Sequence, residues 1–366
     1  MGEVVKEVTR NDPTSEAPIM MITANNGFIE QSERYAFDNA GESLKKYILL
    51  QKGELAYNHG ASKLRPFGSC FALTTAESAR IPFVYHCFSA ENQNAEFLSI
   101  ELNGSEVESQ LRKIVSSGAR MDGLLNISFD EYSTVTVLLP DIKEQEHIAD
   151  FFRNLDHLIT LHQRKYDKLQ VLKKAMLEKM FPKNGSSVPE IRFKGFTDAW
   201  EQRKLGALCV EFKSGDFISA SDIAENEAYP VYGGNGLRGF TNHYNHDGEY
   251  ALIGRQGALC GNVNYAVGKS YFTEHAVAVR ANKTNQTRFL YYLFSTMNLG
   301  QYSGQSAQPG LAVGNLVELE NVVPSKPEQE KIASFLSSLD HLITLHQREL
   351  EKLQNIKKSM LEKMFV

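Results

Sequence analysis

Cysteine is scarce in this sequence of 366 residues, which contains only four copies. Cys70, Cys87, Cys209 and Cys260 lie scattered and show no paired spacing of the kind that binds zinc. Neither a metal site nor a disulfide framework is indicated. Reduced thiols in a cytoplasmic protein are therefore expected.

Long hydrophobic runs and an excess of positive charge are also missing. No apolar stretch approaches the ~20 residues of a membrane span, and residues 1–6 lack the layout of a signal peptide. Lys and Arg total 39 against 44 Asp and Glu, so the formal net charge is −5. A protein that holds DNA through a broad basic surface is usually positive overall, so this balance counts against nucleic acid unless basic faces are local.

Catalytic motifs are absent as well. The sequence has no phosphate-binding P-loop, no His-Glu-x-x-His, no Gly-x-Ser-x-Gly and no Asn-Pro-Pro-Tyr of an adenine methyltransferase. Gly234-x-Gly236-x-x-Gly239 matches the dinucleotide-binding pattern, but residues 240–248 have no amphipathic helical pattern to bind a phosphate. We predict a glycine-rich turn there, and no catalytic site in this chain.

The sequence does contain a long internal repeat. Residues 155–164 return unchanged as residues 339–348, an offset of 184. Over Glu144–Phe181 against Glu328–Phe365, 27 of 38 aligned positions are identical. The chain is therefore two copies of one unit.

Each copy of the repeat is predicted to be one long amphipathic helix, because its apolar residues recur at steps of three and four. Such a helix of about 37 residues is roughly 55 Å long. A rod of this length cannot bury its stripe against one compact domain, so we predict an antiparallel coiled-coil pair with a globular domain at each end. The residues of this stripe expected at the interface of the helix pair or with other subunits are Leu155, Leu158, His162 and Leu169, and Leu339, Leu342, His346 and Leu353.

Two details of these helices carry expectations. Asp141 with Glu144, and Ser325 with Glu328, have the spacing of a capping box. His162 and His157 lack the i, i+4 spacing of a helical zinc pair, so a polar register-setting position is the preferred interpretation of His162.

The domain organisation follows from the repeat, and the predicted fold class is α+β. The expected segments are a first domain at 1–138, a spacer helix at 139–182, a linker at 183–189, a second domain at 190–322 and a second spacer helix at 323–366. Strands are expected at residues 47–50, 135–138, 229–232, 249–253 and 275–279. Helices are expected at 96–116 and 289–294.

With these features the chain closely resembles the specificity (S) subunit of type I restriction–modification enzymes, over nearly its whole length. Residues 189–196, Trp200 and residues 204–206 resemble the opening of a target-recognition domain in that family. Residues 140–148 and 324–332 resemble its entry into the conserved helices.

One departure from the family pattern concerns the start of the chain. Met1-Gly2-Glu3-Val4 aligns with Leu205-Gly206-Ala207-Leu208, so the first unit lacks a counterpart of residues 189–204. We expect either a late start, through truncation or an alternative start, or a strand that is dispensable in the first domain.

The resemblance implies two target-recognition domains that each read one half of a split sequence in double-stranded DNA, with the helix pair setting the spacing. At 3.4 Å per base pair, a rod of roughly 55 Å limits the separation to about 16 base pairs. It also implies docking of two methyltransferase (M) subunits and recruitment of motor/nuclease (R) subunits. S-adenosylmethionine, ATP and Mg are then expected on these partners, and no cofactor on this chain.

Reading DNA requires Arg, Lys, Asn or Gln on loops that reach base edges or phosphates. Loop candidates in the first domain are Asn58, Lys63, Arg65 and Arg120, and in the second domain Asn235, Arg238, Arg255, Gln256, Gln305 and Gln308. Arg255 and Arg120 are preferred, because glycine or small neighbours let the backbone approach a ligand. The alternative for any one of them is a solvated loop residue.

Two other functions remain open at this point. A non-catalytic coiled-coil adaptor that binds proteins rather than DNA agrees with the acidic net charge. A standalone enzyme would require a catalytic constellation that the sequence does not show.

Overall fold

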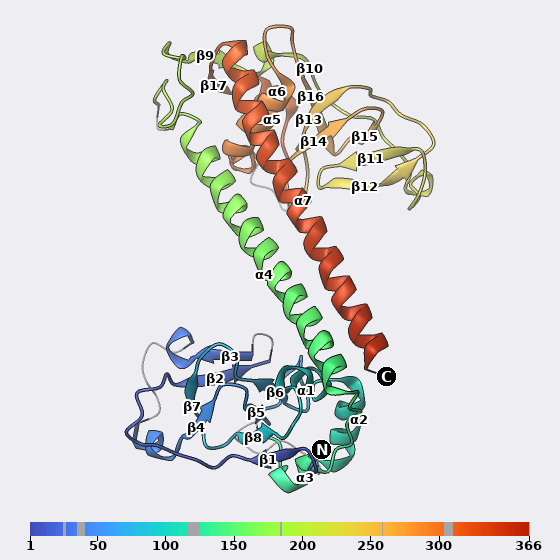
Figure 1. The fold of residues 1–366 in the computed structure, drawn as a ribbon. Coiled ribbons are helices and arrows are strands. Elements are labelled where there is room, and N and C mark those ends of the chain that lie inside the picture. The colour runs from blue at the N-terminus through green and yellow to red at the C-terminus, as the bar shows by residue number, and fades with distance from the viewer. Residues whose placement is uncertain are drawn as a thin grey trace. The chain divides into compact units, whose positions relative to one another are not determined.

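The computed structural model describes residues 1–24, 27–34, 41–115, 124–183, 185–257, 259–303 and 310–365. The chain divides into two compact units. The first unit is Met1–His162 with Glu349–Val366, and the second unit is Gln163–Arg348. Each unit therefore contains one β domain and one end of each long helix (Figure 1).

The two long helices are α4 (Ile142–Lys179) and α7 (Lys326–Met364). In the first unit, Ile148 and Phe152 at the start of α4 belong to a buried cluster that includes Met360 near the end of α7. In the second unit, Met176 near the end of α4 packs on a core that includes Leu336 of α7. The helices are therefore antiparallel in each unit, and the predicted α+β fold with a paired-helix spacer is confirmed.

The buried face of each helix follows a strict heptad pattern, with steps of four and three residues. Its buried or half-buried members are Leu155, Ile159, His162, Tyr166, Leu169, Lys173 and Met176 in α4, and Leu339, Ile343, His346, Leu350, Leu353, Lys357 and Met360 in α7. Leu158 and Leu342, expected on this face, are 42% and 39% exposed. A repeat of 3.5 residues selects the adjacent isoleucines instead, so these leucines lie on the outer face.

The first domain is built on a four-stranded antiparallel sheet in the order β1-β8-β5-β6. Its strands are β1 (Val5–Glu7), β8 (His86–Ala90), β5 (Leu55–Asn58) and β6 (Ser69–Ala72). Two further antiparallel pairs are β2 (Met20–Thr23) with β3 (Gly27–Glu30), and β4 (Ile48–Gln51) with β7 (Ser78–Ile81). The helices are α1 (Ala95–Glu101), α2 (Ser105–Ile114) and α3 (Phe129–Ser133), with 3-10 turns at Gln31–Glu33 and Gly41–Lys46.

The second domain repeats this plan with a sheet in the order β10-β16-β13-β14. Its strands are β10 (Cys209–Ser214), β16 (Ala276–Ala281), β13 (Glu249–Gly254) and β14 (Val263–Val267). A smaller sheet joins β12 (Gly236–Thr241), β11 (Tyr229–Gly233) and β15 (Tyr271–Phe272), and β9 (Glu201–Lys204) pairs with β17 (Glu320–Val323). The helices are α5 (Thr287–Thr296) and α6 (Val313–Glu318), with 3-10 turns at Leu205–Leu208, Ala220–Asp222 and Leu299–Tyr302.

Strand β13 shows why the second domain has an apolar central strand. Ala251 and Ile253 point into the core that contains α5, whereas Tyr250 and Leu252 belong to a separate cluster on the other face. Successive side chains of a strand alternate between faces, so a strand covered on both sides is apolar at every position. The expected strands at 229–232, 249–253 and 275–279 and the helix at 289–294 are confirmed.

Two local predictions differ from the structure. The helical stretch expected at 96–116 is two helices, because Gly104 breaks it and serves as the N-cap residue of α2. Residues 135–138 do not form a strand. Their counterparts in β17 are paired with β9, and the described residues of the first unit contain no strand equivalent to β9. A stretch with alternating apolar residues forms a β-strand only when a neighbouring strand is present to share its backbone hydrogen bonds.

Only one of the two predicted helix caps forms through a side chain. The carboxylate of Asp141 accepts the N–H of Glu144 at 3.0 Å, which is one of the two hydrogen bonds of the predicted capping box. At α7 it is the backbone carbonyl of Ser325 that accepts the N–H of Glu328. The Glu328 carboxylate is engaged elsewhere, because it binds the guanidinium of Arg192 at 2.7 Å.

Candidate nucleic-acid interface

In the second domain, three segments meet at the end of β13. A Cβ placed on Gly254 would lie 2.3 Å from the carbonyl oxygen of Gly234, and one on Gly234 would lie 2.8 Å from that of His275. Such distances leave no room for a side chain, so both positions need glycine. The β11–β12 hairpin, the loop after β13 and the residues before β16 are therefore in backbone contact.

Arg255 occupies the centre of this meeting point. Its backbone N–H donates to the carbonyl of His275, and its carbonyl accepts the N–H of Leu311, each at 2.8 Å. The half-buried guanidinium donates to Ser214 Oγ at 3.3 Å. A fixed backbone with a half-exposed guanidinium, which has five N–H donors, suits the recognition of an acceptor-rich ligand.

Gln256 and His275 form a polar pair beside Arg255. Gln256 is exposed, and its Oε1 lies 2.9 Å from His275 Nδ1. His275 Nε2 lies 3.2 Å from a carboxylate oxygen of Glu274. His275 was not among the residues selected from the sequence, because its position beside Arg255 depends on pairing between strands that are distant in sequence.

The other candidates of the second domain lie on the adjoining hairpin or outside the described residues. Asn235 is exposed in the turn between β11 and β12. Arg238 is exposed too, but it lies on strand β12 rather than on a loop, which corrects its predicted setting. The glycine-rich stretch is a β-hairpin, as the missing helical pattern indicated. Gln305 and Gln308 lie outside the described residues.

In the first domain, two candidates are engaged in internal hydrogen bonds. Asn58 is the last residue of β5, where Nδ2 donates to the carbonyl of Ile22 at 3.1 Å and Oδ1 accepts the N–H of Gly60 at 2.9 Å. Arg65 donates from its guanidinium to the carbonyl of Asn103 at 2.8 Å. Lys63 is exposed in the loop between them. Arg120 lies outside the described residues.

His59 occupies the first-domain position that corresponds to Arg255. The N–H of Leu125 donates to the carbonyl of His59 at 2.9 Å, as that of Leu311 does to Arg255. The His59 side chain is buried, and its ring nitrogens lie 2.7 Å from the carbonyls of Leu125 and Val84. The same backbone framework therefore presents a half-exposed arginine in one domain and a buried histidine in the other.

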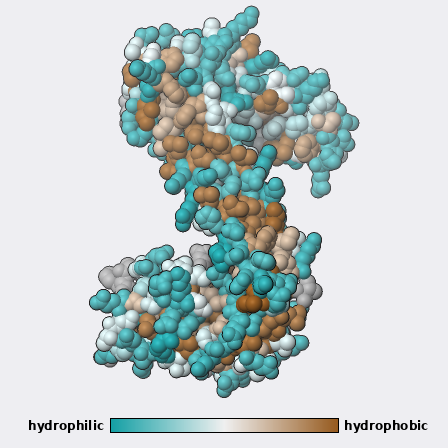
Figure 2. Space-filling model, in the orientation of Figure 1, coloured by the Kyte–Doolittle hydropathy of each residue, from teal (hydrophilic) through white to brown (hydrophobic). Residues whose placement is uncertain are grey.

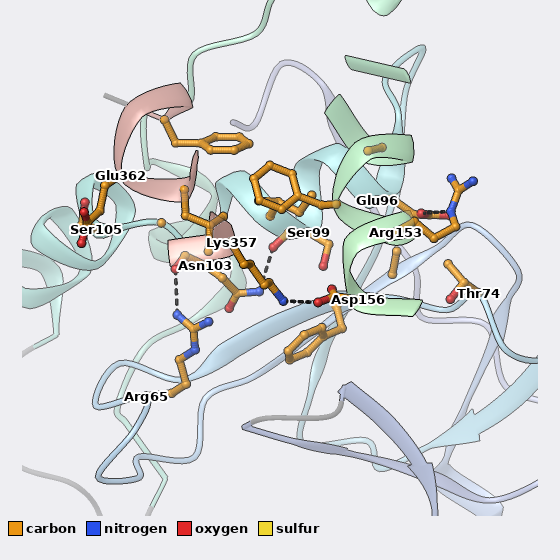
Figure 3. A pocket seen from close by; sticks show the side chains of 18 residues that line it. Arg65, Thr74, Glu96, Ser99, Asn103, Ser105, Arg153, Asp156, Lys357 and Glu362 are labelled. Carbon is orange, nitrogen blue, oxygen red and sulfur yellow. Dashed lines mark hydrogen bonds and ion pairs between the residues drawn. The ribbon is translucent and has the colours of Figure 1, made fainter. Parts of the chain in front are cut away.

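A half-open cavity of about 450 Å³ in the first unit is lined by the ends of the long helices and by residues of the first domain (Figure 3). Lys357 and Asp156 form an ion pair of 2.6 Å at its edge. The equivalent ion pair in the second unit joins Lys173 and Asp340 at 2.5 Å. The carboxylate of Asp340 also accepts a hydrogen bond from the hydroxyl of Tyr292 at 2.6 Å. Ion pairs at heptad positions hold two helices in register.

Metal-ligand clusters and the state of the cysteines were examined over the part of the chain that the structure describes. The described residues include no cluster of three His, Cys, Asp or Glu side chains that could hold a metal ion. The four cysteines are unpaired, and burial raises the pKa of Cys70 and of Cys209 to about 12. No helix in the described part of the chain is long and apolar enough to cross a membrane.

Comparisons with known proteins agree with this picture. Residues 197–355 match the family described as type I restriction modification DNA specificity domain. The chain is 45% identical to the type I restriction enzyme EcoprrI specificity subunit of Escherichia coli over 146 residues, which are 39% of this chain and 36% of that protein. It is 21% identical to the MjaVIII specificity subunit of Methanocaldococcus jannaschii over 296 residues, 72% of this chain and 67% of that protein.

A third curated relative is a putative type I specificity subunit of Haemophilus influenzae, 27% identical over 31% of this chain and 30% of that protein. The alignments with the Escherichia coli and Haemophilus influenzae proteins thus span about a third of each relative. Among solved structures, the S subunit of the type I restriction–modification system from M. genitalium is similar with a TM-score of 0.66. That match covers all of this chain and 94% of the other, at 16% identity, and shows the shared fold.

Proposed function

The chain belongs to the specificity (S) subunits of type I restriction–modification systems, and we propose that it reads a bipartite DNA sequence for such a complex in the cytoplasm without catalysing a reaction. The observation that carries this proposal is the pair of equivalent loops after β5 and β13. One framework is used twice, with Arg255 and Gln256 in the second domain where His59 and Gly60 stand in the first. Two domains that recognise different DNA sequences need a shared backbone framework with different side chains.

The proposed interface of the second domain is the surface formed by Asn235, Arg238, Arg255 and Gln256, with His275 added. Arginine and glutamine side chains read guanine and adenine edges in the major groove through paired hydrogen bonds. Among the described candidates of the first domain, Lys63 has an exposed side chain. Arg120, Gln305 and Gln308 complete the proposed set. Asn58 and Arg65 would act by holding their loop. The proposed reading domains are residues 1–138 and 190–322, with the linker at 183–189.

The outer faces of the two helices support docking of two methyltransferase subunits. Leu158 and Leu161 on α4 are 42% and 38% exposed, and their counterparts Leu342 and Leu345 on α7 are 39% and 43% exposed. Figure 2 shows hydrophobic side chains at the surface of the helices. The residues around both leucine pairs are identical, so one type of partner finds the same surface once in each unit.

The partners would supply all the chemistry. Adenine methylation requires S-adenosylmethionine on the methyltransferase subunits, and DNA translocation and cleavage require ATP and Mg on the motor/nuclease subunits. The role of this chain is to position them on the sequence that it reads. The helix pair would set the gap between the two half-sites, as the resemblance implies.

Copurification and DNA retention test this proposal. The chain is expressed with a methyltransferase subunit, and retention on DNA of the recognised sequence and of scrambled sequence is measured across salt concentrations. We expect copurification and sequence-dependent retention that weakens steeply with salt, because phosphate contacts release counterions. Copurification with no preference between the two DNAs would favour a protein-binding adaptor instead.

Leu161→Glu and Leu345→Glu test the docking surfaces. Each change places a charge on one exposed patch, so each alone is expected to leave one bound methyltransferase subunit and the double change none. The matched control is Val171→Glu, at another exposed apolar position on α4. Two bound subunits in the double variant would contradict the assignment of these leucines.

A further inference from the structure

The cavity of about 450 Å³ in the first unit has small or aliphatic side chains at three positions of its lining, Ala72, Ser99 and Ile100 (Figure 3). Sites for small molecules are usually about 300–1,000 Å³ in volume, so the cavity has the size of such a site. The equivalent positions of the second unit show which chemical group this place accepts.

Helices α1 and α5 occupy equivalent places, because their N-cap residues Asn94 and Gln286 make the same contacts. The backbone N–H of each donates to a buried glutamine at the start of a long helix, and each side chain accepts the N–H of a phenylalanine three residues later. The equivalent pairs on these helices therefore include Glu96 with Arg288, Ser99 with Tyr291 and Ile100 with Tyr292.

The strands that face these helices are equivalent in the same way. Counting back from the equivalent loops, Leu55 of β5 corresponds to Ala251 of β13. Leu55 is paired with Ala72 of β6, and Ala251 is paired with Tyr265 of β14. Ala72 therefore corresponds to Tyr265, so all three small or aliphatic positions of the cavity lining are tyrosines in the second unit.

In the second unit, the three tyrosines form one aromatic cluster. The ring centroid of Tyr291 lies 5.5 Å from that of Tyr265 and 4.8 Å from that of Tyr292. The guanidinium of Arg288 lies 4.7 Å from the ring centroid of Tyr265. The hydroxyl of Tyr292 donates to Asp340 at 2.6 Å. The place equivalent to the cavity therefore holds aromatic rings and a phenol hydroxyl bound to an aspartate.

The aspartate that accepts this hydroxyl has a counterpart in the cavity. Asp156 corresponds to Asp340 in the repeat, and its carboxylate binds Lys357 at 2.6 Å (Figure 3). The side chain of Asp156 is 52% exposed, against 34% for Asp340. A carboxylate has two oxygens that accept about four hydrogen bonds in total, so Asp156 can accept a further donor.

The charges that line the cavity cancel. Two ion pairs, of 2.7 and 2.6 Å, join four of the charged side chains. An uncharged ligand can enter without leaving an unpaired charge behind, which burial would make costly. The charged lining residues are Glu96, Asp156 and Glu362, and Arg65, Arg153 and Lys357.

We propose that this cavity binds a small neutral aromatic compound with a hydroxyl group, a phenol or a naphthol. Its ring packs beside Ala72 and Ile100, in the room that tyrosine rings take in the second unit. Its hydroxyl donates to Asp156, as that of Tyr292 does to Asp340. The ligand thereby connects α1 to the long helices, and it stabilises the first unit because it binds the folded form.

2-Naphthol serves as the probe, because it is fluorescent and its fused rings carry one hydroxyl. It is titrated into the full chain, and its fluorescence reports binding. We expect saturable binding of one molecule per chain. 2-Methoxynaphthalene has the same rings but cannot donate a hydrogen bond, so it should bind about tenfold more weakly. Equal binding of the two compounds would contradict the contact with Asp156 and overturn the proposed ligand class.

Two substitutions locate the bound probe. Ile100→Tyr introduces the tyrosine of the second unit, and it should abolish the binding of 2-naphthol. Asp156→Ala should reduce the affinity for 2-naphthol about tenfold and leave that for 2-methoxynaphthalene unchanged. The matched control is Leu138→Tyr, at an exposed position of the first unit outside the cavity lining, and it should leave binding unchanged. Chemical denaturation shows whether each variant is folded.

Two outcomes would overturn the proposal in the chain alone. One is the absence of saturable binding, and the other is binding that persists in folded Ile100→Tyr. If Ile100→Tyr does not fold, the comparison of the two compounds in Asp156→Ala decides, and an unchanged affinity for 2-naphthol overturns the proposal.

Titration of the complex with methyltransferase subunits separates a free ligand from a tyrosine side chain of a partner. We expect the complex to bind 2-naphthol as the chain alone does. Loss of binding in the complex would show that the partner covers the cavity, and would also overturn the proposal.

Discussion

The two units use the same polar contacts to fix their helices but differ in what surrounds them. Gln145 accepts the N–H of Asn94 at 3.0 Å and donates to the carbonyl of Pro140 at 2.9 Å. Gln329 does the same with Gln286 and Pro324, at 3.0 and 2.9 Å. In each unit one buried glutamine thus ties the start of a long helix to the first turn of a domain helix. These contacts are the same in both units, whereas the loops and the packing at the helix ends differ.

The two units differ at two places, one proposed to act in DNA recognition and the other important for stability. The loops after β5 and β13 differ in their side chains, which are half-exposed at Arg255 and buried at His59, while their backbone contacts correspond. The ends of the helix pair differ in packing, because Trp200 and Arg192 complete one end and no described residue completes the other. Paired substitutions, one in each unit, can measure each difference separately.

The largest effect is expected from Trp200→Ala. The change removes a buried aromatic ring between Phe181 and Phe289, and the second unit should lose about 3–5 kcal/mol of unfolding free energy. Phe151→Ala in the first unit is the control, with an expected loss of about 0.5 kcal/mol or less at an exposed site. Chemical denaturation gives the size, and hydrogen exchange assigns the loss to a unit. Equal losses in both variants would contradict the comparison.

Glu328→Gln and Glu144→Gln form the next pair. Glu328 is buried against Arg192, so its neutralisation leaves a guanidinium without its charge partner and should cost about 3 kcal/mol. Glu144 is exposed, and the same change there should alter the free energy of unfolding by about 0.5 kcal/mol or less. Denaturation midpoints of the two variants provide the test. A costly Glu144→Gln would mean that Glu144 also depends on a charge partner in the first unit.

Arg255→Ala should affect recognition of one half-site only. Loss of a paired hydrogen bond to a base costs about 1–3 kcal/mol of discrimination, and the contacts of the first domain stay intact. His59→Ala is the comparison, since the buried ring holds the first-domain loop. Binding to DNA altered in one half-site at a time measures the effect. Equal loss at both half-sites would remove Arg255 from the interface.

The smallest difference is expected between Asp340→Asn and Asp156→Asn. Asp340 binds both Lys173 and the hydroxyl of Tyr292, so its change should cost about 1 kcal/mol. Asp156 pairs with Lys357 in a more exposed setting, and its change should cost about 0.5 kcal/mol or less. Thermal unfolding of the two variants compares them. A larger loss in Asp156→Asn would show that the cavity beside it depends on the ion pair.

The repeat made the helices and the two-domain plan predictable, because two identical stretches 184 residues apart can be recognised from the sequence alone. The errors arose where tertiary pairing decides the outcome. Residues 135–138 have the alternation of a strand but lack its partner. Leu158 and Ile159 are adjacent apolar residues, and only the heptad geometry of the helix pair selects the second for the buried face.

The candidate interface was predictable only in part. Polarity and glycine neighbours identified Arg255, and the structure places it beside Gln256 and His275. The same criteria selected Asn58 and Arg65, whose hydrogen bonds to Ile22 and Asn103 are invisible in the sequence. The sequence did not identify His59 as the counterpart of Arg255, because their correspondence lies in backbone hydrogen bonds that the sequence does not show.

The most direct test is to map methylated adenines on DNA from cells that express this chain with its methyltransferase subunit, in wild-type and Arg255→Ala forms. The wild type should methylate a bipartite sequence with a fixed gap, and the variant should relax or lose one half of it while the gap stays the same. A continuous methylated sequence, or a variant that changes both halves equally, would contradict the assignment of one reading domain to each unit.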